Sequence, residues 1–157
     1  GLPAPLAGIM IAVFGAMGII SRLVLTPMGA RLRDESLLLF ALIAISAIAI
    51  LVTMQADPAS NWKLWVGAVG VGLTAVATNA IAMGMLLRDP AFGTITTASG
   101  LLSAAFFAGF ALGPPAYGTI SSSADGFAGG WSALIGVLLL GCMLALVLAF
   151  VRRRHNG

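Results

Sequence analysis

Three polar residues near the middle of one apolar stretch are the first candidates for binding chemistry. Asn79, Thr78 and Thr74 lie within the apolar segment 64–87. An Asn in hydrocarbon needs a hydrogen-bond partner, because burying a polar group without one costs free energy. That partner is either a neighbouring helix or a solute or water in a central cavity. The three residues are therefore candidate substrate-cavity residues.

Arg22 is the one charged residue inside an apolar stretch, which spans 6–25. An unpaired Arg in a bilayer is unfavourable, and it calls for an explanation. It lies about four residues from the predicted cytoplasmic end of its stretch, so its side chain can snorkel to the interface. Alternatively it lines an aqueous path and, together with Arg31, forms a cytoplasmic gate or contacts an anion.

Small residues and two prolines mark a further stretch. Ala105, Gly109 and Gly113 recur at intervals of four, which places them on one helix face and lets two backbones approach closely. Pro114 and Pro115 remove two amide donors and predict a bend toward the outer end of the helix. The face serves either ordinary bundle packing or a moving helix seam between two halves of a transporter.

Enzyme chemistry finds no support in the residue types. No apolar stretch contains Asp, Glu or His, and the lone His155 lies in the C-terminal tail, so a nucleophile such as Ser99 has no base. The single Cys142 excludes a disulfide or a paired-thiol metal site within the chain. The net charge of +3 reflects a few arginines beside the membrane and does not indicate nucleic-acid binding. We therefore expect a non-enzymatic protein with no metal, no cofactor and no nucleic-acid partner.

The elements that position these residues are five apolar segments. Only 8 % of the 157 residues are charged, against about a quarter in soluble domains, and the mean hydropathy is +1.08. Each segment has roughly the 20 residues that cross a hydrocarbon core as a helix. The sequence predicts an all-α polytopic membrane bundle, a single membrane domain with five transmembrane helices at about 6–25, 36–54, 64–87, 99–120 and 131–151.

Charges between the segments predict the orientation. If the gaps alternate between the two sides, six arginines (Arg31, Arg33, Arg88, Arg152, Arg153 and Arg154) share one side, and only Lys63 lies on the other. Basic residues of short loops stay cytoplasmic. We expect a multi-pass protein of the cytoplasmic (inner) membrane with a cytoplasmic C-terminus, and Trp62, Trp65 and Trp131 at the outer interface. The polar third helix is expected to face a cavity, and the plain second and fifth helices to face lipid.

Two segments resemble the major facilitator superfamily of transporters. Gly18–Arg33 resembles its eighth span with the following turn, and Gly109–Gly118 with Gly129-Gly130-Trp131 resembles its eleventh span and last outer loop. The resemblance covers the whole chain as spans eight to twelve. It implies a partial major-facilitator fold, in which span seven and the N-terminal six-helix half are missing.

The turn motif of that family, G-x-x-x-D-R-x-G-R-R, is degraded here. Arg31 matches the first Arg, whereas Ala30 replaces the Asp, and Asp34 and Glu35 stand where the last two Arg would be. In the family the Asp and its basic partners form a cytoplasmic charge clamp, which this copy therefore lacks in its usual form.

The function expected from these observations is alternating-access transport. The chain would be the C-terminal portion of a secondary transporter for a small solute, with or without proton coupling. Its partners would be the lipid bilayer, the small-molecule substrate and the missing N-terminal half. The alternative is a five-helix membrane scaffold or assembly subunit with no transport activity.

Overall fold

The computed structural model describes residues 3–32, 35–57, 60–88, 93–122 and 126–155. These residues form five long α-helices, and none of the described ranges contains a β-strand. The helices are α1 (Ala4–Arg31), α2 (Glu35–Met54), α3 (Trp62–Arg88), α4 (Ile95–Ser121) and α5 (Gly126–His155). The prediction of an all-α fold with five long apolar helices is confirmed.

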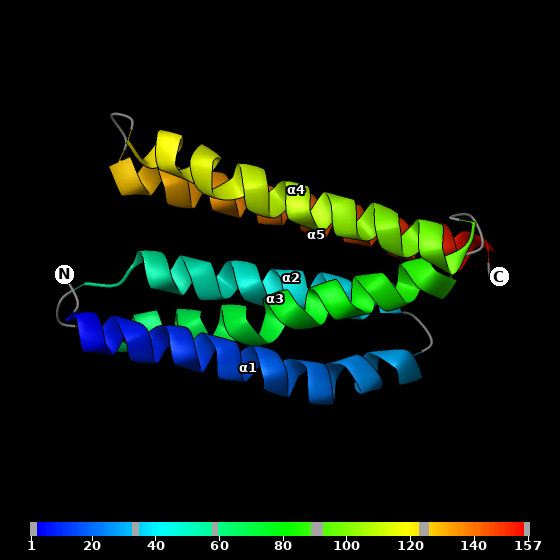
Figure 1. The fold of residues 1–157 in the computed structure, drawn as a ribbon, viewed down its shortest axis with the longest axis horizontal. Helices are drawn as coiled ribbons and strands as arrows, with labels where there is room; N and C mark the ends of the chain where they lie inside the picture. Colours follow the sequence, from blue (N-terminus) through cyan, green and yellow to red (C-terminus); the bar gives the residue numbers. More distant parts are fainter. Residues whose placement is uncertain (1–2, 33–34, 58–59, 89–92, 123–125, 156–157) are drawn as a thin grey trace.

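Every helix is long and apolar enough to cross a membrane. The shortest, α2, has 20 residues, which at 1.5 Å per residue gives about 30 Å, the thickness of a hydrocarbon core. Successive helices run in opposite directions, so α1, α3 and α5 finish at the same end of the bundle (Figure 1). We call this the basic end, because Arg31, Arg88 and the helical residues Arg152–Arg154 occur there.

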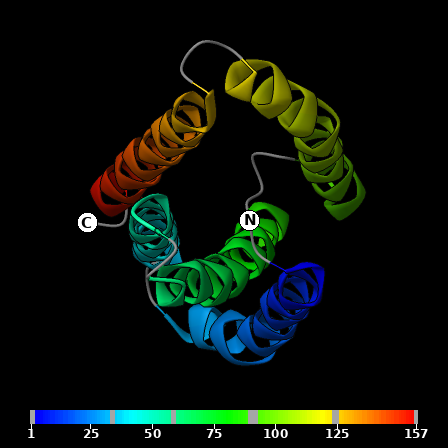
Figure 2. The same ribbon diagram turned by 90° about the vertical axis from the view of Figure 1, so that its left-hand side faces the viewer.

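The helices pack in an order that differs from their order in the chain. α3 contacts both α1 and α2, α5 contacts α2, and α4 contacts α5 and α3 (Figure 2). The small buried core lies between α2 and α3, where Leu42 packs with Ala77, Ile81 and Met85. The last three residues recur every four positions and so line one face of α3.

Three glycines of α3 let its neighbours approach closely. A Cβ atom at Gly72 would lie 2.7 Å from the backbone oxygen of Phe14 on α1, and one at Gly70 would lie 2.7 Å from Ala49 Cβ on α2. At Gly67 a Cβ would collide with the Thr53 hydroxyl. Between apolar helices in lipid, close van der Waals contact is the main attraction, and small residues permit it. These glycines therefore explain why α3 is the centre of the bundle.

The helices extend beyond several predicted ends. α1 continues to Arg31 instead of ending near position 25, with Pro27 inside it, because a proline removes one amide donor but leaves the later amides able to bond. α4 begins at Ile95 instead of position 99, since the Thr94 hydroxyl accepts a hydrogen bond from the Thr97 amide at 3.2 Å and caps the helix. α5 begins at Gly126, so residues 126–130 of the outer loop predicted over 121–130 are helical.

The apolar surface that a lipid-facing α2 requires is present on one of its faces. Leu37, Ile45, Ile48 and Leu51 are exposed along that face. The opposite side packs on α3, and α2 also contacts α5. α5 fits the expectation better, because large apolar side chains such as Val137 and Leu144 are exposed along its length.

Candidate solute pocket between α1, α3 and α4

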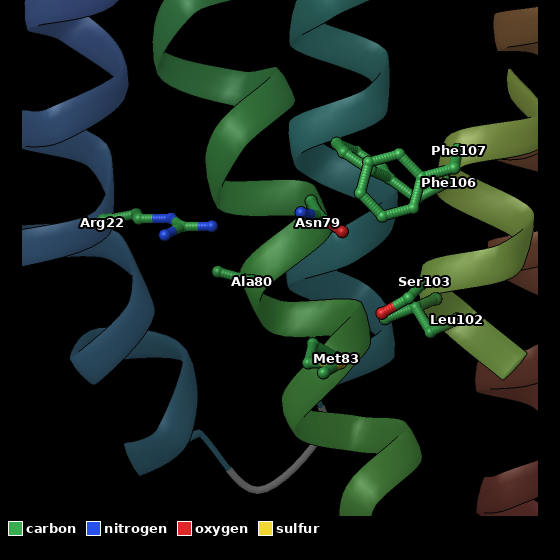
Figure 3. A pocket seen from close by; sticks show the side chains of 8 residues that line it. All are labelled: Arg22, Asn79, Ala80, Met83, Leu102, Ser103, Phe106 and Phe107. Atoms are coloured by element: carbon green, nitrogen blue, oxygen red, sulfur yellow. The ribbon is translucent and has the colours of Figure 1, made fainter. Parts of the chain in front are cut away.

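A cavity of about 350 Å³ lies between α1, α3 and α4. We call it the central pocket. Arg22 enters it from α1, and Figure 3 shows this side chain directed toward Asn79 on α3. The volume is at the lower end of the range of about 300–1,000 Å³ that is usual for ligand pockets. The complete lining is Arg22, Asn79, Ala80, Met83, Leu102, Ser103, Phe106 and Phe107.

Arg22 occupies this position because of the contact between α1 and α3. Its neighbour Ser21 is fully buried in the bundle and donates a hydrogen bond to the Gly18 carbonyl at 2.9 Å. One residue further along a helix is about 100° around it, so the Arg22 side chain emerges at the edge of the buried face. α1 continues for nine residues past Arg22, or about 14 Å. The expectation that Arg22 lies only about four residues from the helix end is therefore wrong.

Asn79 is half-buried on the face of α3 that borders the pocket. Its amide has no hydrogen-bond partner among the described residues, and an amide in an apolar bundle is stabilised by acquiring one. Thus the pocket is lined both by an Asn side chain with free donors and a free acceptor and by a guanidinium group.

The two threonines predicted with Asn79 do not line the central pocket. Thr74 is 2 % exposed, and its hydroxyl donates to the Gly70 carbonyl of the same helix at 2.8 Å. Thr78 is half-buried outside the lining. The reason is helical geometry: five residues separate Thr74 from Asn79, which turns the two side chains about 140° apart.

The wall formed by α4 was not predicted. Ser103 offers a hydroxyl, and the rings of Phe106 and Phe107 extend from α4 toward α3 (Figure 3). Phe106 also meets Phe110 edge-to-face, with 4.8 Å between ring centroids. A signal was present in the sequence, because Ser103, Phe106 and Phe107 lie three and four residues apart and therefore share one helix face.

The small-residue face of α4 lies open. Nothing among the described residues comes within 4 Å of a Cβ built at Gly109 or at Gly113. α4 continues as one helix through Pro114 and Pro115, and its ribbon is curved (Figure 2). Packing of this face within the described chain therefore does not occur, and the face is free to meet another helix.

A second cavity, of about 330 Å³, lies at the basic end and contains a charged pair that sequence reasoning missed. The Arg88 Nη2 atom donates to both oxygens of the Glu35 carboxylate, at 2.6 and 2.7 Å, and Arg88 Nε donates to the Gly84 carbonyl at 2.9 Å. Glu35 is nearly buried, and the pair joins the start of α2 to the end of α3. The buried Thr26 hydroxyl lines the same cavity and has no hydrogen-bond partner within the described ranges.

Arg31, proposed with Arg22 as a gate or anion contact, is exposed at the last turn of α1 and lines neither cavity. Arg33 and Asp34 lie outside the described residues. In the part of the chain that is described, no three His, Cys, Asp or Glu side chains gather as metal ligands. The central pocket offers a cation, an amide, a hydroxyl and aromatic rings for binding.

The fold and the pocket define the class of the protein: an all-helical bundle of five apolar helices, each able to span a membrane, with a largely apolar pocket between three of them that contains three polar side chains. No protein-family model, curated protein or solved structure matches the chain.

Proposed function

We propose that the chain is part of a secondary transporter that moves a small solute by alternating access. The observation that carries the proposal is the central pocket, where Arg22 and Asn79 line one cavity within a bundle of apolar helices. Polar groups at such a depth are unfavourable unless they serve one another or a solute. Secondary transporters place their binding sites near the bilayer midplane, between helices that rearrange.

The proposal extends to the rest of the transporter. The resemblance of Gly18–Arg33 and Gly109–Gly118 to the major facilitator superfamily implies a second helical half. The open face at Gly109 and Gly113 suits a close contact with that half, and Pro114 and Pro115 would supply the bend of a moving seam. The arginines at the basic end favour a cytoplasmic position for that end, in the inner membrane.

A test of alternating access does not require the solute to be known. Cys142 is the single cysteine of these 157 residues. In the protein expressed from its complete reading frame, Cys142→Ala together with replacement of any cysteine elsewhere gives a cysteine-free background. In that background Ser103→Cys places a thiol in the central pocket. We expect a membrane-impermeant methanethiosulfonate reagent to modify this thiol from either side of sealed vesicles, because the pocket opens to each side in turn.

The matched control is Val137→Cys in the same background. Val137 is 68 % exposed on α5, away from the pocket lining. In lipid its thiol does not ionise, and the reagent attacks only the thiolate, so no modification is expected from either side. A Ser103→Cys thiol that reacts from one side only, or from neither, would contradict alternating access and favour the non-transporting scaffold.

Flux measurements test the pocket assignment. Proteoliposomes are screened for saturable counterflow of sugars, amino acids, organic anions and organic cations. For the solute that is transported, Asn79→Leu should lower the flux about fivefold at subsaturating concentration, corresponding to a neutral hydrogen bond of about 1 kcal/mol. Thr119→Val is the control, because the Thr119 hydroxyl is exposed and bonds the Ala116 carbonyl of its own helix. Equal flux in wild type and Asn79→Leu would refute the assignment.

A further inference from the structure

The positive charge of Arg22 is not matched by a carboxylate. The ion pairs of the described residues are Arg88 with Glu35 and Lys63 with Asp57, and both lie at helix ends. Glu35 accepts two hydrogen bonds from Arg88, one on each carboxylate oxygen. Arg22 itself lies within α1 and makes no ion pair or hydrogen bond with a described residue.

The surroundings of Arg22 are complementary to an anion with an apolar body. The guanidinium has five donors and no acceptor, and its planar fork suits carboxylate, sulfonate and phosphate oxygens. The Asn79 amide and the Ser103 hydroxyl add neutral hydrogen-bonding groups to the same pocket. The remaining wall is apolar, with two phenyl rings, Met83 and Leu102. A small cation would be repelled by the positive charge of Arg22, and a neutral sugar would leave that charge uncompensated.

We propose that the central pocket binds an organic anion, in which an acidic group pairs with Arg22 and an apolar, preferably aromatic, body lies against Phe106 and Phe107. The inference rests on the proposed function in taking this anion as the transported solute. Asn79 then acts as a second contact to the acidic group, in keeping with the direction of the Arg22 side chain toward it in Figure 3.

The experiment compares acids with neutral molecules of the same shape. Protein in phosphatidylcholine nanodiscs is titrated with benzoate, 3-phenylpropionate and benzenesulfonate, and separately with benzamide, 3-phenylpropionamide and benzenesulfonamide, while the thermal unfolding midpoint is followed. We expect at least one acid to stabilise the protein at a concentration at least tenfold lower than its amide does. A factor of this size corresponds to hydrogen bonds to a charged group rather than to a neutral one.

The variants assign the preference to one side chain. Arg22→Gln should abolish the preference for the acid, and Arg22→Lys should retain part of it, since a Lys keeps the charge but loses the planar fork. Lys63→Gln is the control: it removes one positive charge from a residue outside the pocket, at the start of α3, and should leave the preference intact. If Arg22→Gln does not fold, the acid and its amide are compared in wild type and in Arg22→Lys. A preference for the acid that is smaller in Arg22→Lys than in wild type then supports the role of Arg22, and an unchanged preference contradicts it.

The pH dependence adds a readout that a purely structural role of Arg22 would not change. Binding of benzenesulfonate should be constant from pH 4 to 8, because the sulfonate stays charged over this range. Binding of benzoate should weaken toward about pH 4, where carboxylic acids take up a proton. A second arm adds phosphatidylglycerol to the nanodiscs, because a lipid phosphate offers the same chemistry. Arg22-dependent stabilisation by this lipid, with none by the soluble acids, would overturn the proposal.

The remaining outcomes separate the two proposals. Equal binding of acids and amides, or a preference for acids that persists in Arg22→Gln, would overturn the anion site. If flux of a neutral or cationic solute is then still sensitive to Asn79→Leu, transport stands without an anion. Arg22-dependent binding of acids, together with a Ser103→Cys thiol that is inaccessible from one side, supports the anion site and overturns alternating access.

Discussion

Substituting Gly72 by Ala tests whether close contact of α1 with α3 holds the bundle together. The new Cβ would lie 2.7 Å from the Phe14 carbonyl oxygen and 3.1 Å from Met17 Cβ. The first is a backbone atom, so the strain cannot be relieved by turning a side chain, and the helices must separate. Such overpacking costs about 1–3 kcal/mol, whereas the helix propensity of Ala returns at most about 1 kcal/mol. We expect Gly72→Ala to lower the free energy of unfolding by about 1–2 kcal/mol.

Gly15→Ala is the matched control on the same pair of helices. Nothing among the described residues lies within 4 Å of a Cβ at this position, so the change should be neutral or stabilising by up to about 1 kcal/mol. Unfolding by SDS in mixed micelles, followed by the fluorescence of the three tryptophans, compares the variants. A difference near 2 kcal/mol is about a 30-fold change in the unfolding equilibrium. Equal stability of Gly72→Ala and Gly15→Ala would refute this account of the α1–α3 contact.

Two further predictions concern contacts at the opposite ends of the bundle, and the same SDS titration measures both. Glu35→Gln should destabilise the protein by about 1 kcal/mol, a reduced value because the Arg88 side chain is 57 % exposed. The double variant Glu35→Gln/Arg88→Gln should lose less free energy of unfolding than the sum of the two single variants. Additive losses would show that the pair contributes nothing to stability. Gly130→Ala should destabilise by about 1 kcal/mol, because a Cβ there would lie 2.8 Å from the Tyr117 ring. Tyr117→Ala should remove that penalty, and a penalty that persists would place its cause elsewhere.

The sequence predicted the helices better than their ends. Hydropathy located all five, because hydrophobic length is a property of each segment alone. α4 starts early because the Thr94 hydroxyl caps the helix. The polar residues before position 99 did not by themselves predict this hydrogen bond. The extension of α1 through Pro27 was missed because a proline in the last turns interrupts one hydrogen bond without ending the helix.

The candidate site was predicted in part. Arg22 and Asn79 are unfavourable in lipid, which marks them in the sequence as candidate site residues, and they line the same pocket. Thr74 was selected for its polarity, yet a Thr can satisfy itself by bonding the carbonyl four residues earlier, and it does so here. Phe106 and Phe107 were not selected because an aromatic ring is equally acceptable in lipid, so polarity does not mark it as part of a site.

The amino-acid sequence by itself determined the number of helices, their length and the grouping of arginines at one end, because each depends on residue type and position along the chain. Only the tertiary structure decided that Arg22 and Asn79 line one pocket, that Arg88 pairs with Glu35, and that the small-residue face of α4 remains open. The physical reason is that apolar helices in lipid gain little from hydrophobicity when they associate. Which helices become neighbours depends instead on how closely their surfaces fit, here at the glycines of α3, and this fit exists only in the packed bundle.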